Sequence, residues 1–181
     1  APSAVVIVAT IRALKMHGGV AKTDLQAENV EALKMGIENL AKHVDTVRTF
    51  GVEPVVALNR FVTDTEAELA AVLAWAKENG VRMARTNVWE EGGKGGIELA
   101  QQVLEAIEAP SKFNHLYDVE AKIEDKVQAI VQKVYGGANV QFTDNAKKQI
   151  ANLVKFGWDT LPICMAKTQY SLSDQPSLLG R

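Results

Sequence analysis

Cysteine is almost absent from this sequence, since its 181 residues include only Cys164. One cysteine forms no disulfide within the chain, which favours a reducing compartment, and we expect a cytoplasmic protein. Histidine is also scarce, with three residues. No cysteine–histidine cluster has the spacing of metal ligands, so no metal site is predicted. We interpret Cys164, which lies in an apolar stretch, as a small buried side chain.

Long hydrophobic runs and an excess of basic charge are missing as well. Apolar runs such as residues 4–9 are far too short to span a bilayer, and no charged segment precedes this run as in a signal peptide. The formal net charge is −2, which gives no sign of a nucleic-acid-binding face. Hydrophobic residues make up 47% of the chain and charged residues 23%, a balance typical of a globular protein rather than a disordered one.

Apolar runs and helical patterns alternate along the first part of the chain. Continuous apolar runs predict strands, and apolar residues at three- and four-residue steps predict helices. The predicted strands are residues 4–9, 52–58 and 81–86, and the predicted helices are about 26–50, 65–80 and 97–107. Thr65 followed by Glu68 fits a capping box. The repeated strand–helix order predicts an α/β fold with a parallel sheet and helices on both of its faces.

The character of the sequence changes after Pro110. Helices are predicted over 123–134 and 143–156, and a strand over 161–165. We therefore divide the chain into a parallel α/β region, 1–109, and a smaller, partial α/β region, 110–181. The chain opens directly into a strand and stops without a closing element, which suggests a piece of a longer protein. A small protein with short tails explains the same observation nearly as well.

Ligands of parallel sheets bind beyond the carboxyl ends of the strands, here in expected loops over 10–20, 59–64 and 86–96. Arg12, Lys15 and His17 follow the first strand and suit a phosphate or carboxylate, although a solvated loop needs no ligand. Residues 92–96, Gly-Gly-Lys-Gly-Gly, are not a Walker A sequence. Their backbone amides and Lys94 either hold an anion or form a flexible turn.

Phe61 and Trp89 follow neighbouring predicted strands. Two aromatic rings at such positions either sandwich a flat heterocycle or cap the end of the sheet. By residue type alone, the cap is the simpler interpretation. The polar run 167–174 leaves a similar choice between a binding site and an ordered loop.

Four segments, taken together, resemble signatures of the formate–tetrahydrofolate ligase family. They are VATIRALKMHGG (8–19), VALNRF with TDTE (56–66), VW with GGKGG (88–96) and LPICMAKTQYSLS (161–173). The resemblance runs in order along essentially the whole chain. It implies an ATP-dependent ligase that joins formate to tetrahydrofolate through formyl phosphate, giving 10-formyltetrahydrofolate, ADP and phosphate in one-carbon metabolism.

The resemblance also implies roles for particular residues. The pterin ring is held between Phe61 and Trp89, and Asn59 belongs to the same substrate loop. The implied substrates are ATP, formate and tetrahydrofolate, with a monovalent cation or Mg²⁺ accompanying ATP in the full enzyme. The resemblance further implies a Rossmann-like sheet related to P-loop nucleoside triphosphatases and a homo-oligomer, with neither a nucleic acid nor a membrane as partner.

The sequence departs from the family in length and in one motif. Family members are much longer and carry an upstream phosphate-binding loop, which this sequence lacks. We therefore expect the 181-residue chain to be catalytically inactive by itself, and we assign no general base. The alternative is a truncated module that binds folate or associates with itself.

Overall fold

The computed structural model describes residues 2–166 and 170–180. These residues fall into two compact units. Unit 1 contains residues 2–113 and 170–180, and unit 2 contains residues 114–166. Within the described residues, no helix combines the length and the apolar character needed to cross a bilayer.

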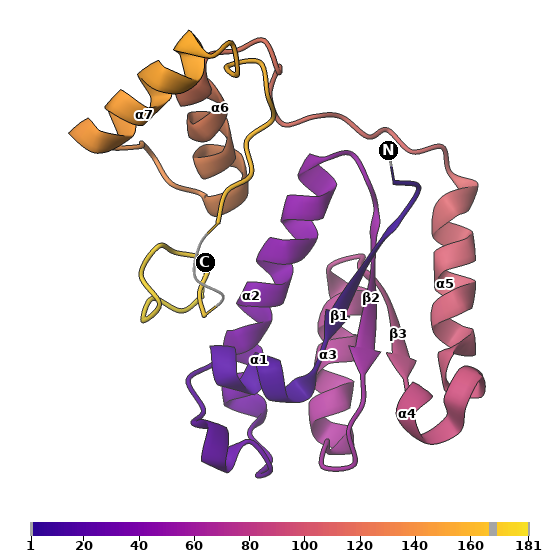
Figure 1. Ribbon diagram of the computed structural model, residues 1–181. Helices are drawn as coiled ribbons and strands as arrows, with labels where there is room; N and C mark the ends of the chain where they lie inside the picture. The colour runs from indigo at the N-terminus through magenta and orange to yellow at the C-terminus, as the bar shows by residue number, and fades with distance from the viewer. Residues whose placement is uncertain (1, 167–169, 181) are drawn as a thin grey trace. The chain divides into compact units, whose positions relative to one another are not determined.

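Unit 1 is built on a parallel sheet whose described strands lie in the order β1-β2-β3 (Figure 1). The strands are β1 (Val5–Ala9), β2 (Pro54–Asn59) and β3 (Arg82–Thr86). Ala57 of the central strand lies opposite Val8 on one side and Ala84 on the other. The parallel arrangement predicted from the strand–helix alternation is therefore confirmed.

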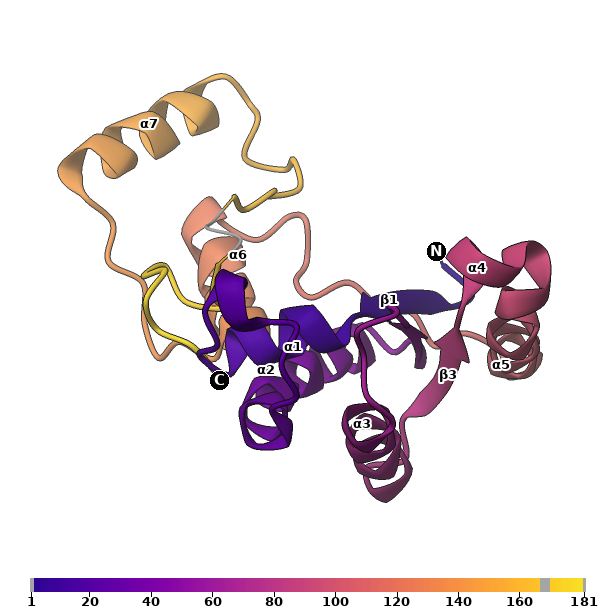
Figure 2. The same cartoon turned by 90° about the horizontal axis from the view of Figure 1, so that it is seen from below.

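Helices cover both faces of this sheet. They are α1 (Ile11–His17), η1 (Lys22–Asp24), α2 (Val30–Thr49), α3 (Glu66–Glu78), α4 (Val88–Glu91), η2 (Gly92–Gly96) and α5 (Ile97–Glu108). Buried residues of α2 and α3 share one hydrophobic core with the sheet. Figure 2 shows α3 and α5 on either side of β3. The helices on both faces agree with the expected α/β architecture.

The main core lies between the sheet and helices α2 and α3. Leu58 of β2, Leu33 of α2 and Leu69 of α3 are completely buried there. The opposite face of β1 is open, because Val6 is 42% exposed and Val8 is 67% exposed. The central strand β2, in contrast, is buried on both faces from Pro54 to Leu58.

Two segments expected to be loops are helical. Residues 11–17 form α1, because the Thr10 side chain accepts a hydrogen bond from the Ala13 amide (3.1 Å) and Leu14 is buried. Residues 88–96 form α4 and η2. The helix expected from residue 26 begins instead at Val30, where the Asn29 side chain accepts from the Ala32 amide (2.9 Å). For α1 and α2, a polar cap therefore decides where the helix begins.

Helices α1 and α2 approach each other closely at two glycines, Gly18 directly after α1 and Gly36 within α2. A Cβ atom at Gly36 would lie 1.8 Å from the carbonyl oxygen of Leu14, and one at Gly18 would lie 1.8 Å from that of Ala32. Gly36 stands inside α2, which continues unbroken through it. This glycine therefore allows α1 to rest directly on α2.

Unit 2 contains α6 (Ile123–Ile130), a π-helical turn η3 (Val131–Tyr135) and α7 (Asp144–Lys155). The strand expected over 161–165 does not form. The Ile163 amide donates to the Tyr117 hydroxyl (2.8 Å), and that hydroxyl donates back to the Ile163 carbonyl (3.4 Å). The buried Lys126 ammonium donates to the Leu161 carbonyl (3.1 Å). Side chains thus satisfy backbone groups that a strand would pair with another strand.

Cys164 is exposed, so its interpretation as a buried side chain is wrong. That interpretation depended on the strand over 161–165, which is not formed. Lys167, Thr168 and Gln169 of the polar run lie outside the described residues.

We expect Gly36→Ala to destabilise unit 1, although alanine normally stabilises a helix interior relative to glycine. The new Cβ collides with the Leu14 carbonyl, and such overpacking costs roughly 1–3 kcal/mol. Amide hydrogen exchange of β2 measures the loss of protection. Gly93→Ala is the control, because a Cβ there meets nothing within 4 Å. Equal effects of the two substitutions would contradict the explanation.

Candidate functional site

The three strands end together at one edge of the sheet. Ala9 at the end of β1 lies opposite Leu58, and Asn59 at the end of β2 lies opposite Thr86 at the end of β3. Helix α1, the segment 60–65 and helix α4 therefore begin side by side at this edge. In parallel sheets this is the edge at which ligands bind.

Phe61 and Trp89 both lie at this edge. The Trp89 indole donates a hydrogen bond to the carbonyl oxygen of Arg60 (3.1 Å), directly before Phe61. Trp89 is 56% exposed, so most of its ring is open to solvent. The edge therefore holds two aromatic side chains from adjacent strand ends, and the Trp89 indole is tied to the backbone of the loop that carries Phe61.

The ring of Phe61 is held from one side by Arg12. The guanidinium carbon of Arg12 lies 4.6 Å from the ring centroid, and its Nη2 donates to the Thr63 hydroxyl (3.1 Å). The backbone amide of Phe61 donates to the Asp64 carboxylate (2.8 Å). Both the ring and the backbone of Phe61 are thus fixed by neighbouring side chains.

Lys15 lies inside the protein, where it forms an ion pair with Glu68. Its Nζ is 2.9 Å from Glu68 Oε1, with the two side chains 1% and 0% exposed. The same Nζ donates to the Ala27 carbonyl (2.9 Å). Glu68 also accepts from the amides of Asn29 (2.9 Å) and Thr65 (3.3 Å). Lys15 is therefore engaged in the interior and does not face a ligand.

The two buried carboxyl groups at this edge have opposite pKa shifts. Burial would raise the pKa of Glu68, but the hydrogen bonds from Lys15 and from two backbone amides lower it overall. Ionised Glu68 therefore stabilises the fold above its ordinary pKa of 4.5, and the contribution is lost as the pH falls through the folded pKa. Burial raises the pKa of Asp64, against the hydrogen bond from the Phe61 amide.

The other candidate residues lie at separate places along the edge. His17 ends α1, and burial lowers the pKa of its imidazole. Asn59 is the last residue of β2. Lys94 is exposed within η2, on the glycine-rich segment.

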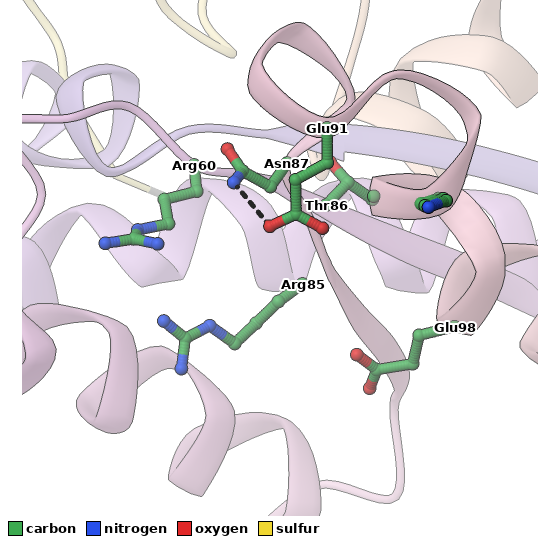
Figure 3. Close-up of a pocket in the computed structure, with 8 residues that line it drawn as sticks. Arg60, Arg85, Thr86, Asn87, Glu91 and Glu98 are labelled. Atoms are coloured by element: carbon green, nitrogen blue, oxygen red, sulfur yellow. Dashed lines mark hydrogen bonds between the residues drawn. The ribbon is translucent and has the colours of Figure 1, made fainter.

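A cavity of about 300 Å³ opens where β2 and β3 end (Figure 3). Its lining combines cationic, acidic and neutral polar groups: Arg60, Arg85, Thr86, Asn87, Glu91, Lys94, Gly95 and Glu98. Asn87 Nδ2 donates to Glu91 Oε1 (2.9 Å), the bond drawn in Figure 3. Arg60 Nε and Asn87 Oδ1 are buried and have no hydrogen-bond partner within the described residues. Arg60 and Asn87 thus line the cavity, and each has one buried polar atom without a hydrogen-bond partner among the described residues.

A sequence model of formate–tetrahydrofolate ligase matches residues 1–181. This chain belongs to the formate–tetrahydrofolate ligase family. It is 58% identical over 179 residues to the formate–tetrahydrofolate ligases of Staphylococcus aureus strains NCTC 8325 / PS 47, MSSA476 and MRSA252. The match covers 99% of this chain and 32% of each relative. The chain therefore spans about a third of these relatives' length.

The edge also contains supporting residues that sequence reasoning missed. Glu68 was recognised only as a helix cap, and its capping box with Thr65 is confirmed. Its ion pair with Lys15 spans 53 positions, and Arg12 and Thr63 are 51 positions apart. No local pattern contains such pairs. A hydrophobic stripe interrupted by a charged residue, as at Glu68 beside Leu69 and Val72, is the only local signal of a buried partner.

Among the described residues, no three or more histidine, cysteine, aspartate or glutamate side chains are grouped so that they could bind a metal ion.

We expect Lys15→Met to lower the free energy of unfolding of unit 1 by about 3–5 kcal/mol, because the substitution leaves the buried Glu68 carboxylate unpaired. Lys34→Met is the matched control, since Lys34 pairs with Glu31 at 3.0 Å on the surface and such pairs contribute at most about 1 kcal/mol. Pulse proteolysis in increasing urea measures both free energies of unfolding. If both variants unfold at the same urea concentration, the buried pair does not stabilise the edge.

Proposed function

We propose that this chain is the tetrahydrofolate-binding segment of an ATP-dependent formate–tetrahydrofolate ligase. The observation that carries the proposal is the aromatic pair at the carboxyl edge of the sheet, with Phe61 fixed in place and Trp89 half-exposed. A pterin is flat and apolar on its faces and polar at its edge. Two aromatic side chains from adjacent strand ends suit its faces.

The adjacent cavity suits the polar edge of the pterin. Arg60 Nε needs an acceptor and Asn87 Oδ1 needs a donor. The pyrimidine edge of a pterin offers both, through its oxo and amino groups. Each strand end would then supply one aromatic ring and one polar group, Phe61 with Arg60 after β2, and Trp89 with Asn87 after β3.

The proposed reaction joins formate to the folate amine. ATP phosphorylates formate, and the amine attacks the carbonyl carbon of formyl phosphate, releasing phosphate and forming the N–C bond of 10-formyltetrahydrofolate. This segment contributes orientation, by holding the folate in register for attack. Lys94 and His17 remain proposed contacts for anionic groups, and Asn59 a proposed folate contact.

Other parts of the ligase complete the proposed enzyme. The printed sequence contains no Walker A motif, so we assign the ATP phosphates, with an accompanying Mg²⁺ or monovalent cation, to residues outside this chain. We also propose a homo-oligomer. The single cysteine supports a cytoplasmic location.

A second candidate function is self-association without catalysis. The exposed Val6 and Val8 on the open face of β1 favour it, because parallel sheets are normally covered on both faces. Sedimentation of the 181-residue chain separates the candidates. Dimers that are lost in Val8→Lys, together with no folate binding, would favour self-association alone.

We expect the isolated 181-residue chain to form at most trace 10-formyltetrahydrofolate from ATP, formate and tetrahydrofolate. A phosphate-binding loop contributes several backbone donors and a lysine, which the isolated glycine-rich turn at 92–96 does not replace. A spectrophotometric assay, with a full-length ligase as the positive control, measures product formation. Sustained product formation by the chain alone would contradict the assignment of the ATP phosphates to residues outside it.

We expect Phe61→Ala to weaken tetrahydrofolate binding in the full-length ligase that contains this segment. Loss of one stacking partner typically costs roughly 1–3 kcal/mol, which corresponds to about a 5- to 150-fold higher Kd. Quenching of tryptophan fluorescence measures the Kd. Phe50→Ala is the control, because Phe50 precedes β2 and stacks on Phe113, away from the carboxyl edge. Equal Kd values for the Phe61 variant and the unchanged ligase would contradict the proposed stacking.

A further inference from the structure

Arg12 reaches Phe61 from a different part of the chain. It stands in the first turn of α1, after β1, whereas Phe61 follows β2. Its guanidinium carbon lies 4.6 Å from the Phe61 ring centroid. A guanidinium at this distance is attracted to the ring by a cation–π interaction. One face of Phe61 is therefore already occupied by protein.

The contacts of Arg12 hold its guanidinium in that position. Nη2 donates to the Thr63 hydroxyl (3.1 Å). Nε is buried and has no hydrogen-bond partner within the described residues. The aromatic ring and the hydroxyl hold this cation in place, and the Asp64 carboxylate lies within its electrostatic range. Because the guanidinium is planar, a lysine at this position would not reproduce the arrangement.

The helix that carries Arg12 is itself anchored. Lys15, three residues further along α1, forms the buried ion pair with Glu68 of α3 (2.9 Å). The backbone of Phe61 is tied separately, through its amide, to the Asp64 carboxylate (2.8 Å). The ring and the cation behind it are therefore held by independent contacts, and their spacing does not depend on a bound ligand.

We propose that Arg12 is a positioning residue for tetrahydrofolate, which backs one face of Phe61 so that the pterin stacks on the other face. This proposal rests on the proposed function. A cation behind the ring draws π electrons toward itself and makes the free face less negative. Such a face suits the electron-rich ring of a reduced pterin better than the electron-poor ring of an oxidised one. Arg12 then acts through Phe61, and it favours tetrahydrofolate over folic acid without touching either.

The test compares Arg12→Met and Arg12→Lys in the full-length ligase that contains this segment. We expect Arg12→Met to raise the KM for tetrahydrofolate by about 2- to 30-fold, the range that corresponds to a cation–π contact. The kcat at saturating tetrahydrofolate and the KM for ATP stay unchanged. The ratio of the Kd values for folic acid and tetrahydrofolate falls toward one. Arg12→Lys keeps the positive charge but lacks the planar guanidinium. We therefore expect its KM for tetrahydrofolate to lie between those of the unchanged ligase and of Arg12→Met.

Arg82→Met is the matched control. Arg82 begins β3 at the opposite edge of the sheet and pairs with Glu105 at 2.8 Å on the surface. We expect it to leave both KM values unchanged. If Arg12→Met fails to fold, Thr63→Val takes its place, because it removes the hydroxyl that orients the guanidinium. We expect this variant to raise the same KM by a smaller factor.

The outcomes separate this proposal from the function on which it rests. If Phe61→Ala raises the KM for tetrahydrofolate and Arg12→Met does not, the role of Arg12 is wrong and the folate site stands. An equal rise in the KM for ATP and for tetrahydrofolate also overturns the proposal, because it indicates a general structural effect. If Phe61→Ala changes nothing, the proposed folate site itself is wrong.

Discussion

A buried ion pair between Lys15 and Glu68 determines how the carboxyl edge of the sheet is assembled. It joins α1, which follows β1, to α3, which follows β2. Burying two charges is costly unless their remaining hydrogen-bonding capacity is used. Here the Ala27 carbonyl accepts a hydrogen bond from the ammonium, and the amides of Asn29 and Thr65 donate to the carboxylate. The pair therefore also fixes the segment before α2 and the start of α3.

The position of Arg12 relative to the Phe61 ring depends on this ion pair. Arg12 lies on the same helix as Lys15, and Phe61 lies in the segment that leads into α3. With α1 and α3 fixed to each other, the guanidinium and the ring meet at 4.6 Å. The close approach of α1 and α2 at Gly36 supports the same arrangement. A ring held by packed elements would need little further ordering in the proposed folate site.

The two aromatic side chains differ in how firmly they are held. Phe61 is bound through both its ring and its backbone. Trp89 stands on a four-residue helix, is 56% exposed and donates its indole N–H to the Arg60 carbonyl. The edge therefore combines a firmly held ring, that of Phe61, with an exposed ring, that of Trp89. In the proposed folate site, the pterin would stack on a Phe61 ring that is already in place.

Local patterns in the sequence were sufficient for much of the architecture. The apolar runs gave the strands because residues buried on both faces of a sheet must be apolar, and the Thr65–Glu68 capping box gave the start of α3. The same reasoning failed at 161–165, where Tyr117 satisfies the backbone of Ile163. It also failed for the expected loop over 10–20, in which residues 11–17 form α1. In both places, partners or caps rather than apolar periodicity decide the conformation.

The sequence by itself determined the alternating α/β order, the family resemblance and the location of Phe61 and Trp89 at one edge of the sheet. Only the tertiary structure decided that Lys15 is a buried partner of Glu68 and that Arg12 faces the ring of Phe61. The physical reason is distance along the chain. A strand or a cap depends on residues within a few positions, whereas these contacts join positions more than fifty apart and exist only after the parallel strands have brought α1 and α3 together.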